Sequence, residues 1–199
     1  MAERSITRIV GEGQYGIIAP ERDLMRVDRL VTFSIFQCFA LGIFDSQAKV
    51  GLFAHLGHPH DLIAMQDQIP SLLELGAKEV VIQTMGIDNL AAWGPEHFGA
   101  AYAFKIGREM AMEALVAECE TQKLKVTEGK WQELGYQPHA AFIVQEGLRA
   151  AHPEQLVDEI NNTELQRALR FQQALEEAVE RRDPAVNTPI CAYQPRVVI

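Results

Sequence analysis

Two apolar segments separated by a short polar one are the strongest constraint on the fold of this chain. "CFALGIFD" occupies residues 38–45 and "VGLFAHLG" occupies residues 50–57, and the connecting "SQAK" supplies turn chemistry. Short apolar runs bounded by turn residues are typical of β-strands in a protein core. The segment 38–57 therefore predicts a β-hairpin.

The register of this hairpin brings two reactive side chains together. If the chain folds around residues 46–48, Cys38 lies directly opposite His55 on the neighbouring strand. Opposed side chains on paired strands have Cβ atoms about 4.5–5.5 Å apart. This is contact range for a thiol and an imidazole, so the sequence predicts that the two side chains meet.

The rest of the chain alternates between strand-like and helix-like patterns. Further strands are predicted at residues 5–11, 14–20, 29–36, 78–86, 124–127 and 139–147, with an edge strand at 193–199. Helices are predicted at residues 61–75, 105–122 and 153–183. The first has Asp61 as a cap, Pro70 as a break or start and Gly76 as a stop. The last has a break near Asn161 and Asn162. Residues 86–102 are expected to form a loop. Together these elements predict an α+β domain over residues 1–150, built as a layered β-sandwich with helices packed on one face, and a C-terminal helical extension over residues 151–199.

Charge and composition narrow the classes of partner. The net charge of the 199 residues is −9, and no run of lysines and arginines offsets it, so we expect no nucleic acid partner and favour a basic protein surface. There is no run of 18 apolar residues and no secretory signal pattern at the start. We therefore expect a cytoplasmic protein without membrane insertion.

The three cysteines differ in their surroundings. Their odd number and the absence of a CxxC motif argue against a disulfide framework and against a thiolate zinc site. Cys119 lies in a helical pattern and is expected to be a small buried residue, and Cys191 near the C-terminus has no evident role. Cys38 is therefore the cysteine whose neighbourhood suggests chemistry.

The segment around Cys38 resembles a known family. "TFSIFQCFALGIFDSQAKVGLFAHLGHP", residues 32–59, is similar to the signature of the CheD chemoreceptor glutamine deamidases, which have a threonine six residues before a cysteine and a histidine 17 residues after it. Thr32, Cys38 and His55 keep both spacings. Residues 10–17, 69–82 and 105–118 also resemble the opening strand and helices of that family, so the likeness spans about residues 6–127.

The resemblance implies a protein-glutamine deamidase with a cysteine–histidine–threonine triad. Cys38 would be the nucleophile, His55 would carry the proton, Thr32 would orient the imidazole, and backbone N–H groups near Cys38 would bind the oxyanion. No cofactor or metal is required. The expected partners are a protein that bears the target glutamine, a chemoreceptor or another protein, and a regulatory protein.

One departure from the family leaves other functions open. Ile35, Phe36 and Gln37 stand where the family usually has Leu-Gly-Ser, which puts the oxyanion pocket and the substrate in doubt. A similar fold also serves the catalytic domain of cytotoxic necrotizing factors, so a delivered effector is a second branch. A non-catalytic protein-binding module on the same fold is one alternative.

A metal-dependent hydrolase is the other alternative. It would use His55, His58 and His60, with Asp61 as a further ligand, although this spacing is not a standard one. His58 and His60 are otherwise expected to be exposed loop residues. Trp93 and Phe98 are expected either to face the substrate or to pin their loop to the core.

Overall fold

The computed structural model describes residues 6–19, 27–33, 35, 38–86, 98–135, 137–160, 162–163, 165–170 and 173. Its strands are β1 (Ile6–Ile9), β2 (Gln14–Ile18), β3 (Val27–Phe33), β4 (Phe39–Asp45), β5 (Val50–Leu56), β6 (Glu79–Gly86), β7 (Lys125–Val126), β8 (Gln132–Glu133), β9 (His139–Ile143) and β10 (Gly147–Ala150). Its helices are α1 (Asp61–Gln66), α2 (Ile69–Glu74) and α3 (Phe98–Thr121), with short 3-10 turns η3 (Thr127–Gly129) and η4 (Pro153–Leu156).

The described strands form two sheets. The smaller has the order β1-β3-β9-β10, and the larger has the order β2-β5-β4-β6-β7, with β8 also paired to β6. In the larger sheet the pairs β2–β5, β5–β4 and β4–β6 are antiparallel, whereas β7 and β8 each pair with β6 in parallel. The predicted combination of sheets and helices is confirmed at this level.

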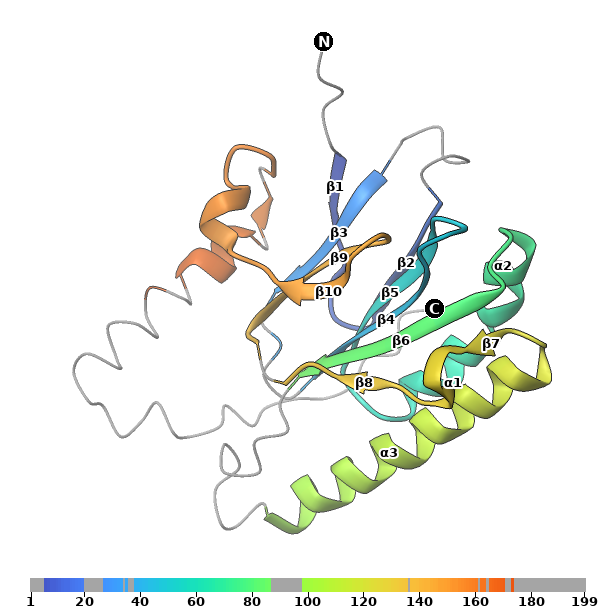
Figure 1. Cartoon of the computed structure of the whole chain (residues 1–199). Helices are drawn as coiled ribbons and strands as arrows, with labels where there is room; N and C mark the ends of the chain where they lie inside the picture. Colours follow the sequence, from blue (N-terminus) through green and yellow to red (C-terminus); the bar gives the residue numbers. More distant parts are fainter. Residues whose placement is uncertain are drawn as a thin grey trace.

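The two faces of the larger sheet are covered by different layers. Side chains such as Leu41 and Leu52 pack with apolar residues of α1, α2 and α3 on one face. On the other face Phe44 and Phe53 pack with Phe142 of the smaller sheet. Figure 1 shows this order, with the helices on one side of the larger sheet and β3, β9 and β10 on the other. Every residue of β4 and β5 is buried, because the hairpin lies between two covering layers.

Small residues allow the sheets to approach closely at Phe142. Its ring stacks on that of Phe53 with centroids 5.6 Å apart and an interplanar angle of 4°. A Cβ at Gly51 would lie 2.6 Å from this ring, and one at Gly42 would lie 3.1 Å from it. The glycines of the two apolar segments therefore make room for an aromatic side chain from the opposite sheet.

A buried carboxylate closes the β4–β5 hairpin. Asp45 accepts hydrogen bonds from the backbone N–H groups of Gln47 and Ala48 in the turn, and of Lys78 and Glu79 at the start of β6. Burial acts to raise the pKa of Asp45, but these four donors outweigh it and leave the pKa below its usual value. The turn is thereby tied to the neighbouring strand.

Several predicted elements differ from the structure. The segment predicted as a helix at 61–75, with Pro70 as a break or start, is two helices: the chain turns at Asp67 and Gln68, and Pro70 lies in the first turn of α2, in agreement with the prediction for Pro70. Gly76 ends α2 with a φ of +97°, as predicted. Asp61 does not cap the helix. Its carboxylate instead accepts hydrogen bonds from the N–H groups of Gly57 and His58, which precede it.

The remaining differences lie around α3 and in the last third of the chain. Helix α3 begins at Phe98, so the loop predicted at 86–102 is too long at its end. The strand predicted at 139–147 ends at Ile143 and turns into β10, which the sequence pattern does not reveal. Most of the helix predicted at 153–183 lies outside the described residues, although 165–170 are helical and 157–160 are not. The edge strand predicted at 193–199 also lies outside them.

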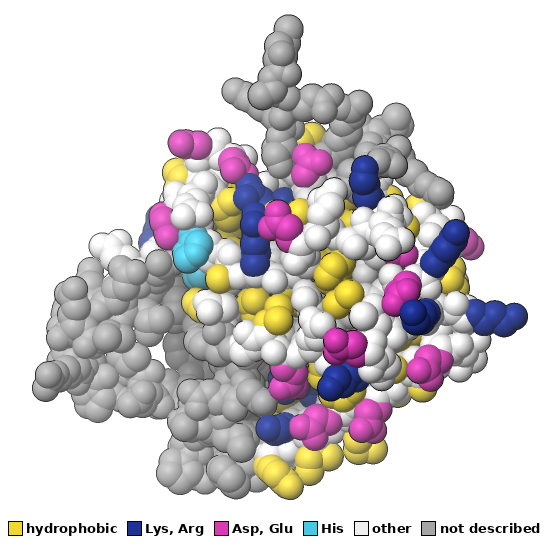
Figure 2. All heavy atoms as spheres, in the orientation of Figure 1, with side chains coloured by type: hydrophobic (Ala, Val, Ile, Leu, Met, Phe, Trp, Pro, Cys, Tyr) yellow, Lys and Arg dark blue, Asp and Glu magenta, His cyan; other side chains and the backbone are white. Residues whose placement is uncertain are grey.

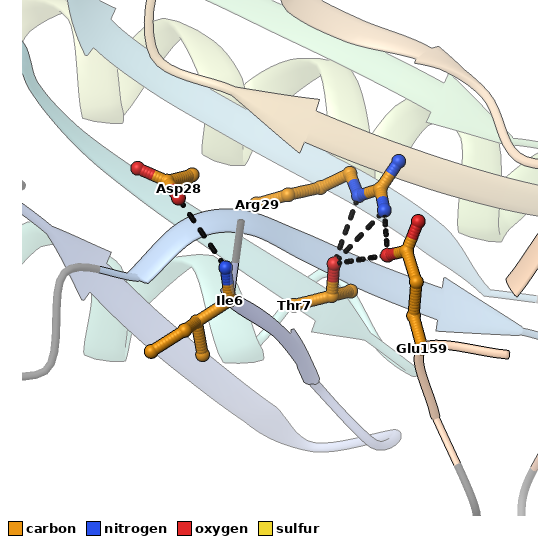
Figure 3. Close-up of polar contacts among 5 residues, drawn as sticks. All are labelled: Ile6, Thr7, Asp28, Arg29 and Glu159. Atoms are coloured by element: carbon orange, nitrogen blue, oxygen red, sulfur yellow. Dashed lines mark hydrogen bonds and ion pairs between the residues drawn. The ribbon is translucent and has the colours of Figure 1, made fainter. Parts of the chain in front are cut away.

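Residues after β10 pack on the outer face of the smaller sheet. Leu156, Ile160 and Leu165 contact a cluster that includes Val31 and Phe33 of β3. Figure 3 shows the polar contact beside this cluster, where Glu159 accepts hydrogen bonds from Thr7 Oγ1, at 2.9 Å, and from the Arg29 guanidinium. This packing covers the side of β3 that faces away from the larger sheet.

Candidate active site

Cys38 lies at the entrance to β4, one residue before the strand begins. Its side chain is half-buried and packs against the apolar cluster between the two sheets. The thiol donates a hydrogen bond to Oε1 of Glu12, with a sulfur–oxygen distance of 3.4 Å. The sulfur is thus at the edge of the sandwich, beside the turn that joins β1 to β2.

The hairpin containing Cys38 and His55 is confirmed, but its predicted register is wrong by two residues. Ala40, not Cys38, pairs with His55, and Phe39 pairs with Leu56. The reason is the turn, which spans residues 46–49 and has Lys49 in the left-handed region with a φ of +53°, so it is centred one position later than expected.

A shift of two residues keeps the same face of the sheet, because side chains alternate with a period of two. Extending the observed pairing by one residue places Cys38 diagonally from His55 rather than opposite it. Diagonal neighbours on one face have Cα atoms about 7–8 Å apart, with their side chains closer. A thiol and an imidazole can therefore still approach each other from these positions.

The third predicted residue reaches His55 from the other sheet. Thr32 points inward from β3, and its Oγ1 lies 2.7 Å from Nδ1 of His55 in a buried hydrogen bond. Both side chains are almost fully buried, with exposed fractions of 0% for Thr32 and 2% for His55. The structure thus joins Thr32 and His55 across the sandwich, which strand periodicity alone does not predict.

The other ring nitrogen of His55 has no such contact. Among the described residues, Nε2 of His55 is buried and has no hydrogen-bond partner. Burial lowers the pKa of His55 from its usual value of 6.5 to about 4, so the imidazole is uncharged at neutral pH. A buried polar atom without a partner is uncommon in folded proteins and calls for an explanation.

Two further residues shape the site, and neither was expected from the sequence. Glu12 reaches Cys38 because the N–H of Gly13 donates to the carbonyl of His55, at 2.8 Å, and holds the β1–β2 turn against β5. Gly86 ends β6 beside the cysteine, where a Cβ would lie 2.9 Å from the carbonyl oxygen of Cys38 and 2.7 Å from Cβ of Phe39. The sequence signals were the Gly-Glu-Gly segment at 11–13 and a glycine at a strand end, both of which also occur in ordinary turns.

The histidine cluster does not gather into a ligand set. Nδ1 of His58 accepts a hydrogen bond from the N–H of His60, and its ring lies edge-on to Phe104 at 6.1 Å. His55 instead points between the sheets toward Thr32. In the described part of the chain, no three His, Cys, Asp or Glu side chains are placed to hold a metal ion together.

The remaining predicted residues have different outcomes. Cys119 is fully buried in the cluster under α3, as predicted, and burial raises the pKa of its thiol to about 12. Ile35 is buried between the sheets. Four further residues to which the sequence drew attention lie outside the described residues, namely Phe36, Gln37, Trp93 and Cys191, and of Phe98 only the backbone is described.

Comparisons with known proteins provide no family for this chain. Neither a protein-family model nor a curated protein matches the sequence.

No helix in the described residues is both long and apolar enough to span a membrane. On the face shown in Figure 2, Lys and Arg side chains are scattered among Asp and Glu.

Proposed function

We propose that this protein is a cysteine-dependent deamidase that converts selected protein glutamines to glutamates. Cys38 is the nucleophile, His55 transfers the proton, and Thr32 positions the imidazole. The proposal includes the CheD-like form of the fold and the C-terminal helical extension. The observation that carries it is the buried Nε2 of His55, which has no partner among the described residues while Nδ1 is bound to Thr32.

The tautomer of His55 determines what its free nitrogen can do. With the ring hydrogen on Nδ1, the imidazole donates to Oγ1 of Thr32, and the lone pair of Nε2 is available as a base. A low pKa keeps this base uncharged at neutral pH, which is the form that can accept a proton. The same burial disfavours an imidazolium that has no negative partner. The thiol proton therefore moves to Nε2 only while the sulfur becomes a thiolate beside it or bonds to the substrate carbon.

The reaction then has two halves. In the first, the sulfur of Cys38 bonds to the glutamine carboxamide carbon, its proton passes to Nε2 of His55, and the imidazolium protonates the departing nitrogen, so that ammonia leaves and a thioester remains. In the second, water attacks the thioester carbon and gives a proton to Nε2. That proton returns to the sulfur as the carbon–sulfur bond breaks, which releases glutamate and the free thiol. Backbone N–H groups near Cys38 stabilise the oxyanion in both halves.

The test is the release of ammonia from a set of blocked glutaminyl peptides, read together with the mass gain of amide becoming acid. Activity is expected in the wild type, and is expected to be lost in Cys38→Ser and in His55→Gln. Cys191→Ser is the matched control and is expected to retain activity. If Cys38→Ser releases ammonia as fast as the wild type, the nucleophile is wrong. If none of the proteins is active on any peptide, a binding module is favoured.

A further inference from the structure

The carboxylate of Glu12 is in hydrogen-bond contact with the proposed nucleophile. It lies on the turn between β1 and β2, is exposed, and accepts the thiol hydrogen of Cys38 at 3.4 Å. The hydrogen bond from Gly13 N–H to the His55 carbonyl fixes this turn against the strand that carries the imidazole. Glu12 therefore stands where solvent reaches the sulfur, on a turn held in place by the site itself.

This placement affects the sulfur in two ways. A carboxylate that accepts the thiol hydrogen holds it in a hydrogen bond, whereas catalysis must transfer this proton to His55. A negative charge beside the sulfur also disfavours the thiolate, because like charges at short distance repel. Among the described residues, Glu12 contacts Cys38 through the hydrogen bond, and His55 lies on the strand next to β4, opposite Ala40. With Nε2 of His55 unpartnered, the thiol proton is directed to Glu12 rather than to the base.

We propose that Glu12 selects glutamines that have a lysine or arginine beside them, and that pairing with this cation turns the cysteine on. The inference rests on the proposed deamidase function and names its substrate class. The cation from the substrate forms an ion pair with the Glu12 carboxylate, which then gives up the thiol hydrogen. The freed proton transfers to Nε2 of His55 as the sulfur bonds to the carboxamide carbon. The net charge of −9 favours the same class of substrate, a basic protein surface.

The first experiment measures charge selection at Cys38 without requiring deamidation. Methanethiosulfonate reagents with a cationic, neutral or anionic tail each form a mixed disulfide with the thiolate and release methanesulfinate. Rates at Cys38 are followed by peptide mass spectrometry in the wild type, in Glu12→Gln, and in Glu128→Gln. Glu128 is an exposed matched control beyond β7, which pairs with the opposite end of β6 from Gly86.

The wild type is expected to react faster with the cationic reagent than with the anionic one. One unit charge at about 4 Å in water changes a rate about fivefold, so Glu12→Gln is expected to lower the cation-to-anion ratio by about fivefold or more. The neutral reagent is expected to react faster with Glu12→Gln than with the wild type, because the thiolate is no longer repelled. A ratio that is the same in Glu12→Gln and the wild type, or that falls equally in Glu128→Gln, overturns the inference.

The second experiment separates this inference from the proposed function. Blocked peptides carry glutamine beside lysine, alanine or glutamate, on either side, and kcat/KM for ammonia release is compared between the wild type and Glu12→Lys. The wild type is expected to prefer the lysine peptide, and Glu12→Lys is expected to prefer the glutamate peptide. Deamidation without a charge preference overturns the role of Glu12 and leaves the deamidase standing. Charge-selective labelling without deamidation of any peptide overturns the deamidase and leaves Glu12 as a selector of cations at Cys38.

Discussion

Acid should destabilise this protein before its carboxylates are protonated, because two buried histidines resist protonation in the folded state. Burial lowers the pKa of His55 to about 4, and burial is also the main cause that lowers the pKa of His139 to about 4. In the unfolded chain both should have a pKa near 6.5. Between about pH 6.5 and pH 4 the unfolded chain therefore binds more protons than the folded one, and stability decreases as the pH is lowered through this window.

The size of the effect follows from the width of the window. Each pH unit below the unfolded pKa costs about 1.4 kcal/mol per histidine until the folded pKa is reached. At about pH 5 the loss is therefore about 2 kcal/mol for His55 and a similar amount for His139. Asp45 and Glu159 have pKa values below their usual ones. What they contribute to the free energy of unfolding is therefore lost mainly below pH 5, so it does not obscure a comparison between pH 7 and pH 5.

The assay is urea unfolding at pH 7 and at pH 5, followed by circular dichroism, with the free energy of unfolding extrapolated to zero urea. The wild type is expected to lose about 4 kcal/mol between the two conditions, as the sum of the two histidines. His55→Gln and His139→Gln should each lose about half as much, and the double variant almost nothing. If His55→Gln shows the same loss as the wild type, its imidazole is not buried between the sheets and the site geometry proposed above is wrong.

Three further substitutions test the surroundings of the site. Thr32→Val keeps the shape of the side chain but leaves Nδ1 of His55 without its partner. The free energy of unfolding should fall by about 1–3 kcal/mol, and the rate of deamidation should fall by about a hundredfold. Unchanged values in urea unfolding and ammonia release would show that the hydrogen bond between Thr32 and His55 is unimportant. Gly86→Ala forces a Cβ against the carbonyl of Cys38. It should lower the free energy of unfolding in urea by about 1–3 kcal/mol and change the alkylation rate of Cys38. An unaltered alkylation rate would contradict the close packing of Gly86 against Cys38. Asp45→Asn weakens the hydrogen bonds that the carboxylate accepts from four backbone N–H groups. It should lower the free energy of unfolding by about 1–3 kcal/mol, and with it the thermal midpoint, while the alkylation rate of Cys38 in the folded protein stays the same. A changed alkylation rate would argue against a purely structural role for Asp45.

The local pattern of the sequence was sufficient to predict the central hairpin but not its exact pairing. Apolar residues bounded by turn residues predict two adjacent strands, and the structure has β4 and β5 there. The register depends on which residue of the turn adopts the left-handed conformation, and this is Lys49. A lysine is not a usual residue for that conformation, so the sequence offers no signal for it. The error of two residues preserved the face on which Cys38 and His55 lie, because an even shift leaves strand alternation unchanged.

By itself the sequence determined which side chains share a face of the hairpin, since the period of a β-strand is fixed by its backbone geometry. The spacing of Thr32, Cys38 and His55 led to the triad only through resemblance to a family. Only the tertiary structure brought Thr32 from the smaller sheet to within 2.7 Å of the His55 ring, and only it placed Glu12 beside the thiol. Both contacts join segments that are distant along the chain, and they depend on how the two sheets pack on a shared core. Such packing is the sum of many weak apolar contacts, which no local motif encodes.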